Sequence, residues 1–181
     1  MKVSKTSLPG VLIIEPNIFQ DNRGFFKETF QVDKYNEIGI DLSFVQDNYS
    51  RSKKGTLRGL HLQKKHPQGK LVSCSVGKVY DVVVDVDPSS NTFGKYFGTE
   101  LSELNHLQLW IPPRYAHGFC VMSEYADFQY KCTNLYSPKD EVGLIWNDPD
   151  VGINWPVDSP IISDKDLKLP TLKSIKLLDG K

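Results

Sequence analysis

Two histidines in strand-forming surroundings are the side chains of this sequence best suited to chemistry. His61 lies in the segment Thr56–Gln63, and His117 follows the run Ile111–Ala116. The neighbouring residues offer a cation and hydrogen-bond donors, but they do not form a plausible metal cage. Because histidine titrates near neutral pH, the pair indicates proton transfer on a carbonyl compound. Each could instead be an ordinary core histidine whose ring is satisfied by backbone groups.

A metal site is the first alternative, because double-sheet barrels often hold a metal on inward-facing histidines. Such a site typically uses a His-x-His pair, a nearby glutamate and a third histidine from a later strand. Here Gln63 stands where the second histidine would be, and no acidic residue occurs between Asp47 and Asp81. Two lysines directly after Gln63 would also repel a divalent cation. The sequence therefore predicts no metal and no other cofactor.

The hydrophobic pattern indicates many short strands with turn residues between them. Alternation is clearest in Val76–Asp87, where Tyr80, Val82 and Val84 face one way and Asp81 and Val83 the other. Short helices are expected only at Val32–Ile38 and after Ser163, so an all-β sandwich or closed barrel is favoured. The remaining expected strands are Val11–Glu15, Gly24–Phe30, Ser43–Ser50, Gly69–Ser75, Tyr96–Leu101, Gln108–Ile111, Gly118–Val121 and Ala126–Asn134.

Length and composition indicate a single domain over residues 1–181, with an irregular tail over residues 150–181 that wraps the barrel. Lysine plus arginine equals aspartate plus glutamate at 22 each, so we expect neither nucleic acid nor a membrane surface as partner. The chain has no run of 18 apolar residues and no signal-peptide pattern, which predicts a cytoplasmic protein. Cys74, Cys120 and Cys132 are expected to be reduced core thiols.

Six short segments add a more specific pattern. They are Asp21–Glu28 (DNRGFFKE), Gln46–Ser50 (QDNYS), Leu57–His61 (LRGLH), Gln68–Lys70 (QGK), Ile111–Phe119 (IPP followed by HGF) and Trp146–Pro149 (WNDP). Each segment is weak alone, but the ordered set resembles the dTDP-4-dehydrorhamnose 3,5-epimerase family over nearly the whole chain.

The resemblance implies a metal-free cupin-type jelly roll, a double-stranded β-helix. It also implies a homodimer in which the N-terminal region contributes to the sheet and the site of the partner. The implied reaction is epimerisation at C3 and C5 of a nucleotide-linked 4-keto-6-deoxyhexose, most simply the dTDP-linked step toward L-rhamnose in polysaccharide biosynthesis.

Residue roles follow from matching the motifs of the family. His61 would be the general base, Tyr130 the proton donor on the opposite ring face, and Asp166 the partner that orients His61. Lys70, with His117, would stabilise the enolate oxygen. Tyr136 would stack on the base, and the other implied substrate contacts are Arg23, Phe26, Glu28, Gln46, Asn48, Arg58, Glu141 and Lys165.

The chemistry suits these residue types. Hydrogens at C3 and C5 are both alpha to the C4 ketone, so removing either leaves an enolate whose charge rests on the C4 oxygen. Losing one preorganised donor to such an oxygen typically costs about 2.7 to 4 kcal/mol of barrier. Alternation in Phe128–Cys132 places Phe128, Tyr130 and Cys132 on one face, which allows an inward Tyr130.

Each role has a plainer alternative. Asp166 has the Ser-x-x-acid spacing of a capping box with Ser163, Tyr130 could be a core tyrosine, and Lys70 could extend to solvent. The arginines that precede glycine could be surface cations, although that pairing suits close approach to a diphosphate.

Two positions depart from the family pattern. Tyr49 stands where many members have histidine, and Leu62 stands where tyrosine is common. Both adjoin recognition positions, so they bear on substrate preference more than on reaction type. Three other functions stay open: a mono-epimerase on a related nucleotide sugar, a metal-dependent cupin oxygenase or isomerase, and a catalytically silent nucleotide-sugar-binding module.

Overall fold

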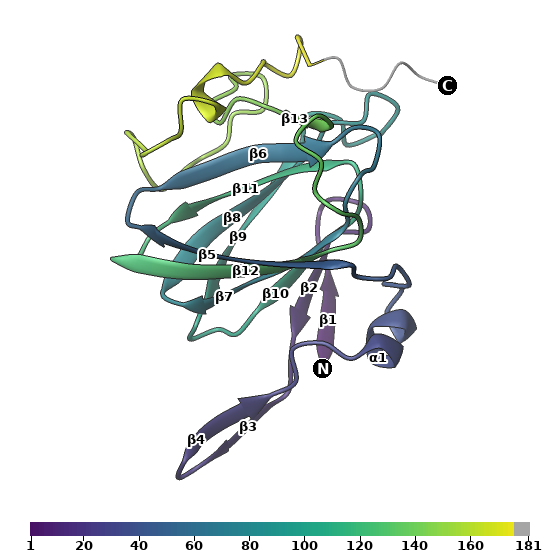
Figure 1. Ribbon diagram of the computed structural model, residues 1–181, viewed down its shortest axis with the longest axis vertical. Coiled ribbons are helices and arrows are strands. Elements are labelled where there is room, and N and C mark those ends of the chain that lie inside the picture. The colour runs from purple at the N-terminus through teal and green to yellow at the C-terminus, as the bar shows by residue number, and fades with distance from the viewer. Residues whose placement is uncertain (176–181) are drawn as a thin grey trace.

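Two antiparallel sheets, packed face to face, form the body of the protein in the computed structural model, which describes residues 1–175 (Figure 1). The six-stranded sheet has the spatial order β1 (Lys2–Lys5), β2 (Leu12–Glu15), β10 (Gln108–Ile111), β7 (Lys70–Val76), β12 (Tyr125–Cys132) and β5 (Gln46–Lys53). The five-stranded sheet has the order β13 (Glu141–Gly143), β6 (Leu57–Gln63), β11 (Tyr115–Val121), β8 (Lys78–Asp85) and β9 (Tyr96–Ser102). This arrangement confirms the predicted all-β, jelly-roll fold.

The main core fills the space between the sheets. Val72 and Phe128 from one sheet meet Val83 and Phe119 from the other, and the rings of Phe119 and Phe128 stack with centroids 4.1 Å apart. Apolar burial of this kind is the main force that holds two sheets together. The predicted alternation of β8 is confirmed, because Val83 lies in this inner core while its neighbours in sequence pack on the outer face of the sheet.

The segment from residue 150 to 175 covers that outer face. Val151, Trp155 and Leu172 pack against Leu60 and Val82 of the five-stranded sheet. Apart from the 3₁₀ turn η1 (Asp166–Lys168), the segment has no helix or strand of its own, and Figure 1 shows it crossing over β6. The prediction of an irregular, wrapping tail is confirmed for these residues, and residues 176–181 lie outside the described part of the chain.

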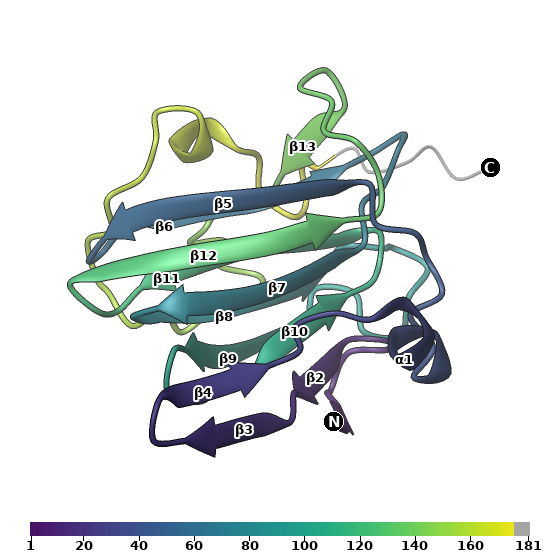
Figure 2. The ribbon, with the colours of Figure 1, turned by 60° about the horizontal axis from the view of Figure 1, so that its bottom comes forward.

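The N-terminal region adds a hairpin that pairs with neither sheet. Strands β3 (Ile18–Asp21) and β4 (Gly24–Lys27) pair only with each other, followed by helix α1 (Val32–Glu37). Figures 1 and 2 show the hairpin projecting from the body at the end opposite the tail. It exposes large apolar side chains, with Phe19 61%, Phe25 56% and Phe26 66% exposed.

Some expected elements need correction. The strand expected over Val76–Asp87 begins only at Lys78, because β7 extends to Val76 and Gly77, at φ 74°, makes the turn between the two strands. Strands β1, β3, β6 and β13 are absent from the expected strands. β1, β3 and β13 have at most four residues each, and in the seven-residue β6 the successive buried residues Gly59 and Leu60 break the alternation. No helix within the described residues is long and apolar enough to cross a membrane.

A β-bulge in the five-stranded sheet decides which side chains face inward. His117 pairs with His61 and Phe119 pairs with Arg58, so two residues of β6 oppose the single residue Gly118 of β11. Under strict alternation, side chains three residues apart face opposite sides of a sheet. The extra residue brings Arg58 and His61 to one cavity.

Gly118 permits this close approach of the two strands. A Cβ atom added there would lie 2.6 Å from the carbonyl oxygen of Arg58, and backbone atoms cannot move aside cheaply. We predict that Gly118→Ala lowers the free energy of unfolding by about 1 to 3 kcal/mol, the usual cost of overpacking. Urea unfolding of both proteins measures this change, and equal stability would show that the bulge relaxes without cost.

Candidate active site

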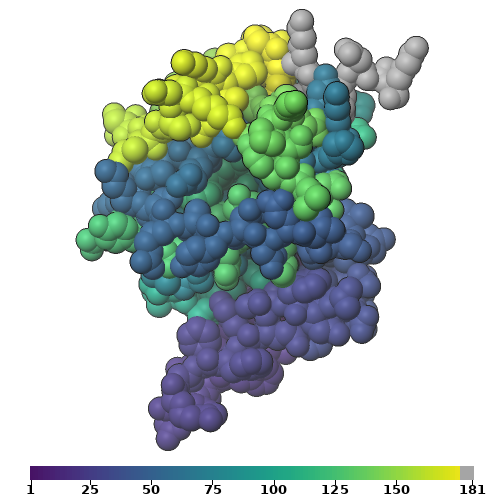
Figure 3. Space-filling model, in the orientation of Figure 1, coloured from purple at the N-terminus to yellow at the C-terminus, as the bar shows by residue number. Residues whose placement is uncertain are grey.

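A cavity of about 580 Å³ opens between the two sheets, a volume within the range of small-molecule sites. Ser50 of β5 and Ile161 of the tail border it, and Figure 3 shows the surface hollowed between these parts of the chain. The structure brings nine of the sequence-predicted residues to this cavity: Arg58, His61, Lys70, His117, Tyr130, Tyr136, Glu141, Lys165 and Asp166.

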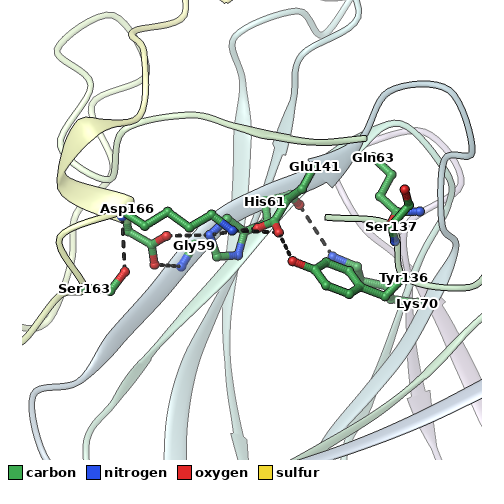
Figure 4. A network of polar contacts seen from close by, with 10 residues as sticks. Gly59, His61, Gln63, Lys70, Tyr136, Ser137, Glu141, Ser163 and Asp166 are labelled. Carbon is green, nitrogen blue, oxygen red and sulfur yellow. Dashed lines mark hydrogen bonds and ion pairs between the residues drawn. The ribbon is translucent and has the colours of Figure 1, made fainter. Parts of the chain in front are cut away.

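His61 and Asp166 form a close pair. The Nε2 atom of His61 lies 2.7 Å from Oδ1 of Asp166, whose Oδ2 accepts the backbone N–H of Gly59 at 3.2 Å (Figure 4). If Nε2 carries the proton toward Asp166, Nδ1 keeps the lone pair that a base needs. Nδ1 has no hydrogen-bond partner among the described residues, so it is available to a bound molecule.

Asp166 takes part in both arrangements considered from the sequence. Its backbone N–H donates to Oγ of Ser163 at 3.1 Å, which is half of a capping box, while its carboxylate turns to His61. Burial acts to raise the pKa of Asp166, but the hydrogen bonds from His61 and Gly59 outweigh it and hold the pKa below its ordinary value. The carboxylate therefore stays charged behind the imidazole.

Glu141 is a second carboxylate beside the same histidine. Its Oε1 lies 3.5 Å from Nε2 of His61, and its Oε2 accepts from Nζ of Lys165 at 2.7 Å and from the hydroxyl of Tyr136. Burial acts to raise the pKa of Glu141, but the hydrogen bonds from Lys165 and Tyr136 lower it overall. One carboxylate thus joins the catalytic histidine candidate to two recognition candidates (Figure 4).

Lys70 places a buried ammonium group at the cavity. Its side chain is directed inward, and Nζ lies 3.5 Å from the backbone oxygen of His61. Burial lowers the pKa of Lys70, while the nearby charges of Glu141 and Asp81 oppose the shift. The alternative in which Lys70 extends to solvent is wrong, because the residue is only 8% exposed.

His117 has a carboxylate partner that the sequence analysis missed. Its Nε2 lies 2.9 Å from Oδ2 of Asp81, a fully buried residue of β8. Burial lowers the pKa of His117 and raises that of Asp81, while their mutual attraction opposes both shifts. A signal was present, since alternation in β8 places Asp81 on the same face as Val83, the face that proves to be the barrel interior.

Tyr130 supplies a phenol from the wall opposite His61. It belongs to β12 of the six-stranded sheet, whereas His61 belongs to β6 of the five-stranded sheet, and both line the cavity. The predicted alternation in β12 is confirmed, since Phe128 is in the inner core and Tyr130 packs against it. Burial raises the pKa of Tyr130, so the hydroxyl keeps its proton at neutral pH.

Five predicted residues do not line this cavity. Arg23 and Phe26 lie on the projecting hairpin, where Arg23 pairs with Asp21, and Glu28 pairs with Lys34 of α1. The other two, Gln46 and Asn48, lie on β5, bonded to each other at 2.9 Å, and Oε1 of Gln46 accepts the backbone N–H of Tyr136.

Gln63, at the position of a possible metal ligand, uses its amide elsewhere. Its Nε2 donates to the backbone oxygens of His66 and Leu135, and its Oε1 accepts the N–H of Ser137. Within residues 1–175 no group of three or more histidine, cysteine, aspartate or glutamate side chains could hold a metal ion. The three cysteines are buried and free of disulfide bonds, as the sequence predicts.

A jelly-roll barrel whose cavity presents a carboxylate-supported imidazole, an opposed phenol and a buried ammonium group is a cupin-type acid–base enzyme. Comparisons with known proteins make the class more specific. The family model for dTDP-4-dehydrorhamnose 3,5-epimerase matches residues 5–174. The chain belongs to the dTDP-4-dehydrorhamnose 3,5-epimerase family, which makes it an isomerase.

Individual relatives agree with this membership. A dTDP-4-dehydrorhamnose 3,5-epimerase from Shigella flexneri is 53% identical over 92% of this chain and 93% of its own length. The crystal structure of a 3,5-epimerase from Legionella pneumophila, in complex with dTDP-4-keto-L-rhamnose, superposes with a TM-score of 0.94 at 48% identity, covering 96% of this chain and 94% of that one. A dTDP-4-dehydrorhamnose 3-epimerase from Streptomyces niveus is 36% identical over 92% of this chain and 81% of its own length.

The charge on Asp166 should be visible in the acid stability of the protein. Because the folded-state pKa of Asp166 lies below the ordinary 3.8, its charge stabilises the fold above that pH, and the contribution is lost as the pH falls through the folded pKa. We predict that Asp166→Asn costs about 2 kcal/mol of unfolding free energy at neutral pH. The difference from the parent in urea unfolding experiments should shrink as the pH falls below 3.8 and through the lower folded-state pKa.

Asp47→Asn is the matched control, because Asp47 pairs with Lys131 on the surface at 2.9 Å. Exposed ion pairs contribute about 0 to 1 kcal/mol, so this variant should lose much less stability. Equal losses from the two variants at neutral pH would contradict a special role of the Asp166 carboxylate in the fold.

Proposed function

We propose that this protein epimerises C3 and C5 of a dTDP-linked 4-keto-6-deoxyhexose, converting dTDP-4-dehydro-6-deoxy-D-glucose to dTDP-4-dehydro-L-rhamnose without a cofactor. The observation that carries the proposal is the placement of a base and an acid on opposite sheets. Inversion of a carbon requires removal of a proton from one face and its return to the other, and His61 and Tyr130 face one cavity from its two walls.

The proposed step balances without a co-reactant. Nδ1 of His61 takes the proton from C3 or C5, and the C–H electron pair forms a carbon–carbon double bond while the carbonyl electrons move to the C4 oxygen. The hydroxyl of Tyr130 then protonates the same carbon from the opposite face, as the double-bond electrons form the new C–H bond and the C4 carbonyl re-forms. Afterwards His61 gives up the proton that it gained, and Tyr130 regains the proton that it lost, both by exchange with solvent.

Charge placement supports the enolate. Lys70 is buried, so its attraction to an anion is screened less than at the surface, and preorganised donors of this kind are a large part of catalysis. His117, held by Asp81, adds a second polar group beside it. Asp166 favours the imidazolium that His61 becomes, as in other carboxylate–histidine pairs.

The outer part of the cavity suits a nucleoside diphosphate. Arg58 and Lys165 supply cations at its border, and Tyr136 supplies an exposed aromatic ring for a base. The Legionella relative was solved with dTDP-4-keto-L-rhamnose, which supports a dTDP-linked sugar for this chain as well. Membership in a family of biosynthetic sugar-nucleotide enzymes also supports a cytoplasmic location, where such substrates are made.

We further propose a homodimer in which the hairpin β3–β4 completes the site of the partner. The hairpin exposes three phenylalanines, and exposed clusters of aromatic residues mark interaction surfaces. Arg23 and Phe26, which the family pattern assigns to substrate binding, do not reach the cavity of their own chain. A second copy is the occupant that would bring them to a site.

A mono-epimerase is the second candidate. The Streptomyces niveus relative is named as a 3-epimerase, so acting at one carbon occurs among close relatives of this fold and sequence. Acid and base placed on opposite walls suit either outcome, and the number of inverted centres decides between them.

Deuterium incorporation tests the reaction directly. With dTDP-4-keto-6-deoxyglucose in deuterated water, NMR should show deuterium at both C3 and C5, whereas deuterium at one carbon would establish the mono-epimerase. His61→Ala should reduce exchange at least about a hundredfold, because general-base catalysis contributes about 10² to 10⁴. Tyr130→Phe should retain exchange better than completed inversion.

Two controls make this test specific. His66→Ala removes a histidine whose side chain does not line the cavity and does not lie on the hairpin, and it should exchange like the parent. Near-parental exchange in His61→Ala would exclude His61 as the base. Substrate that binds without any exchange in the parent protein would indicate a silent binding module instead of an enzyme.

Subunit mixing tests the shared site. Arg23→Ala and His61→Ala proteins should each be nearly inactive, but their mixed dimers should contain one intact site if Arg23 acts on the partner. Random reassortment makes half of the dimers mixed, so about one quarter of parental activity should return.

Arg58→Ala mixed with His61→Ala is the matched control, because Arg58 and His61 line the same cavity of one chain. No mixed dimer of that pair has an intact site, so no activity should return. Failure of the Arg23 mixture to regain activity, while size measurements show exchanged dimers, would place Arg23 in its own site or outside any site.

A further inference from the structure

The segment between β12 and β13 carries Tyr136 without regular secondary structure to hold it. β12 ends at Cys132 and β13 begins at Glu141. Leu135 is 67% exposed and Tyr136 is 49% exposed, so neither side chain is anchored in the core. The position of the Tyr136 ring therefore depends on the hydrogen bonds of the backbone around it.

Gln63 makes those hydrogen bonds on both sides of Tyr136. Its Nε2 donates to the carbonyl oxygen of Leu135 at 3.1 Å, and its Oε1 accepts the N–H of Ser137 at 2.7 Å. The amide is 3% exposed and also donates to the carbonyl oxygen of His66 at 2.8 Å, which fixes its orientation. One buried amide thus holds the residue before and the residue after Tyr136.

Two further side chains hold the rest of Tyr136. Gln46 accepts the backbone N–H of Tyr136 at 2.8 Å, and Glu141 accepts its hydroxyl. Gln63 and Glu141 are register partners on the adjacent strands β6 and β13, so the amide and the carboxylate lie side by side. In Figure 4, Gln63 and Ser137 lie beside the ring of Tyr136, away from the His61–Asp166 pair.

We propose that Gln63 is a positioning residue for nucleotide recognition, which holds Tyr136 in the orientation that stacks on the base of a nucleoside diphosphate. The inference rests on the proposed function, since it takes Tyr136 as the stacking residue. Gln63 follows His61 by two positions on β6, but its amide directs its three hydrogen bonds to His66, Leu135 and Ser137, so it acts on affinity and not on proton transfer.

The test measures the binding of dTDP by calorimetry and the rate of deuterium exchange with saturating substrate. Gln63→Met keeps the length of the side chain but loses all three hydrogen bonds. If the competent orientation of Tyr136 falls to about a tenth of the population, the Kd for dTDP and the KM rise about tenfold while kcat stays within about twofold. If the methionine variant does not fold, Gln63→Glu takes its place. It keeps the acceptor for Ser137 but loses the hydrogen bonds donated to His66 and Leu135, and the same changes in Kd, KM and kcat are expected.

A double-mutant cycle shows whether Gln63 acts through Tyr136. Tyr136→Ala should weaken dTDP binding about tenfold or more, in line with stacking on an aromatic ring. Adding Gln63→Met to Tyr136→Ala should then change the Kd by less than about twofold, because the residue that Gln63 positions is gone. If the two substitutions each raise the Kd and their effects multiply in the double variant, the proposal is overturned.

Gln68→Met is the matched control, because Nε2 of Gln68 donates to the carbonyl oxygen of Asn134, in the same segment but not next to Tyr136. It should leave dTDP affinity within about twofold of the parent. Equal weakening by Gln68→Met and Gln63→Met would overturn the assignment to Gln63. Parental dTDP affinity in Tyr136→Ala would instead overturn the stacking role of Tyr136. If Tyr136→Ala weakens dTDP binding and Gln63→Met does not, only the role of Gln63 is overturned.

Discussion

The hydrogen bond between His61 and Asp166 is the contact on which the site depends. It joins residues 105 positions apart, one on a central strand of the barrel and one on a segment without strands. Asp166 reaches His61 only because the tail is packed over the outer face of the five-stranded sheet, where Val151, Trp155 and Leu172 bury apolar surface. Packing on one side of the sheet therefore positions a charge on the other.

The charges at the cavity are arranged so that each buried ion has a partner. Asp166 and Glu141 flank His61, Asp81 lies behind His117, and Lys70 lies within reach of several of these charges. An isolated buried charge would be costly, and removing one partner leaves the other charge buried and unpaired. This mutual dependence keeps the groups in fixed positions, so little reorganisation is needed when a negative charge forms on a substrate.

The sequence predicts those parts of the fold and site that follow from local pattern, and it fails where a feature depends on pairing between strands. Alternation separated Val83 from Val82 and Val84 and allowed an inward Tyr130, and both Val83 and Tyr130 lie in or against the inner core. Motif matching assigned Lys70 and Asp166 to the site, and both line the cavity. The bulge opposite Gly118 was not predictable, because it is a property of two strands in register. Alternation put Asp81 on the same face as Val83, but its contact with His117 was not predictable from either strand alone, because the two residues lie on different strands.

The two parts of the site are built by different physical means. His61, Lys70, His117 and Tyr130, which are proposed to carry out the proton chemistry, lie on paired strands whose backbone hydrogen bonds fix their positions. Tyr136, the proposed stacking residue, lies on an irregular segment fixed by side-chain amides, so its position can change without disturbing a sheet. Relatives that differ in name between 3,5-epimerase and 3-epimerase both match 92% of this chain in sequence. A rigid acid–base barrel combined with a separately anchored recognition segment would allow substrate preference to diverge while the proton chemistry is kept.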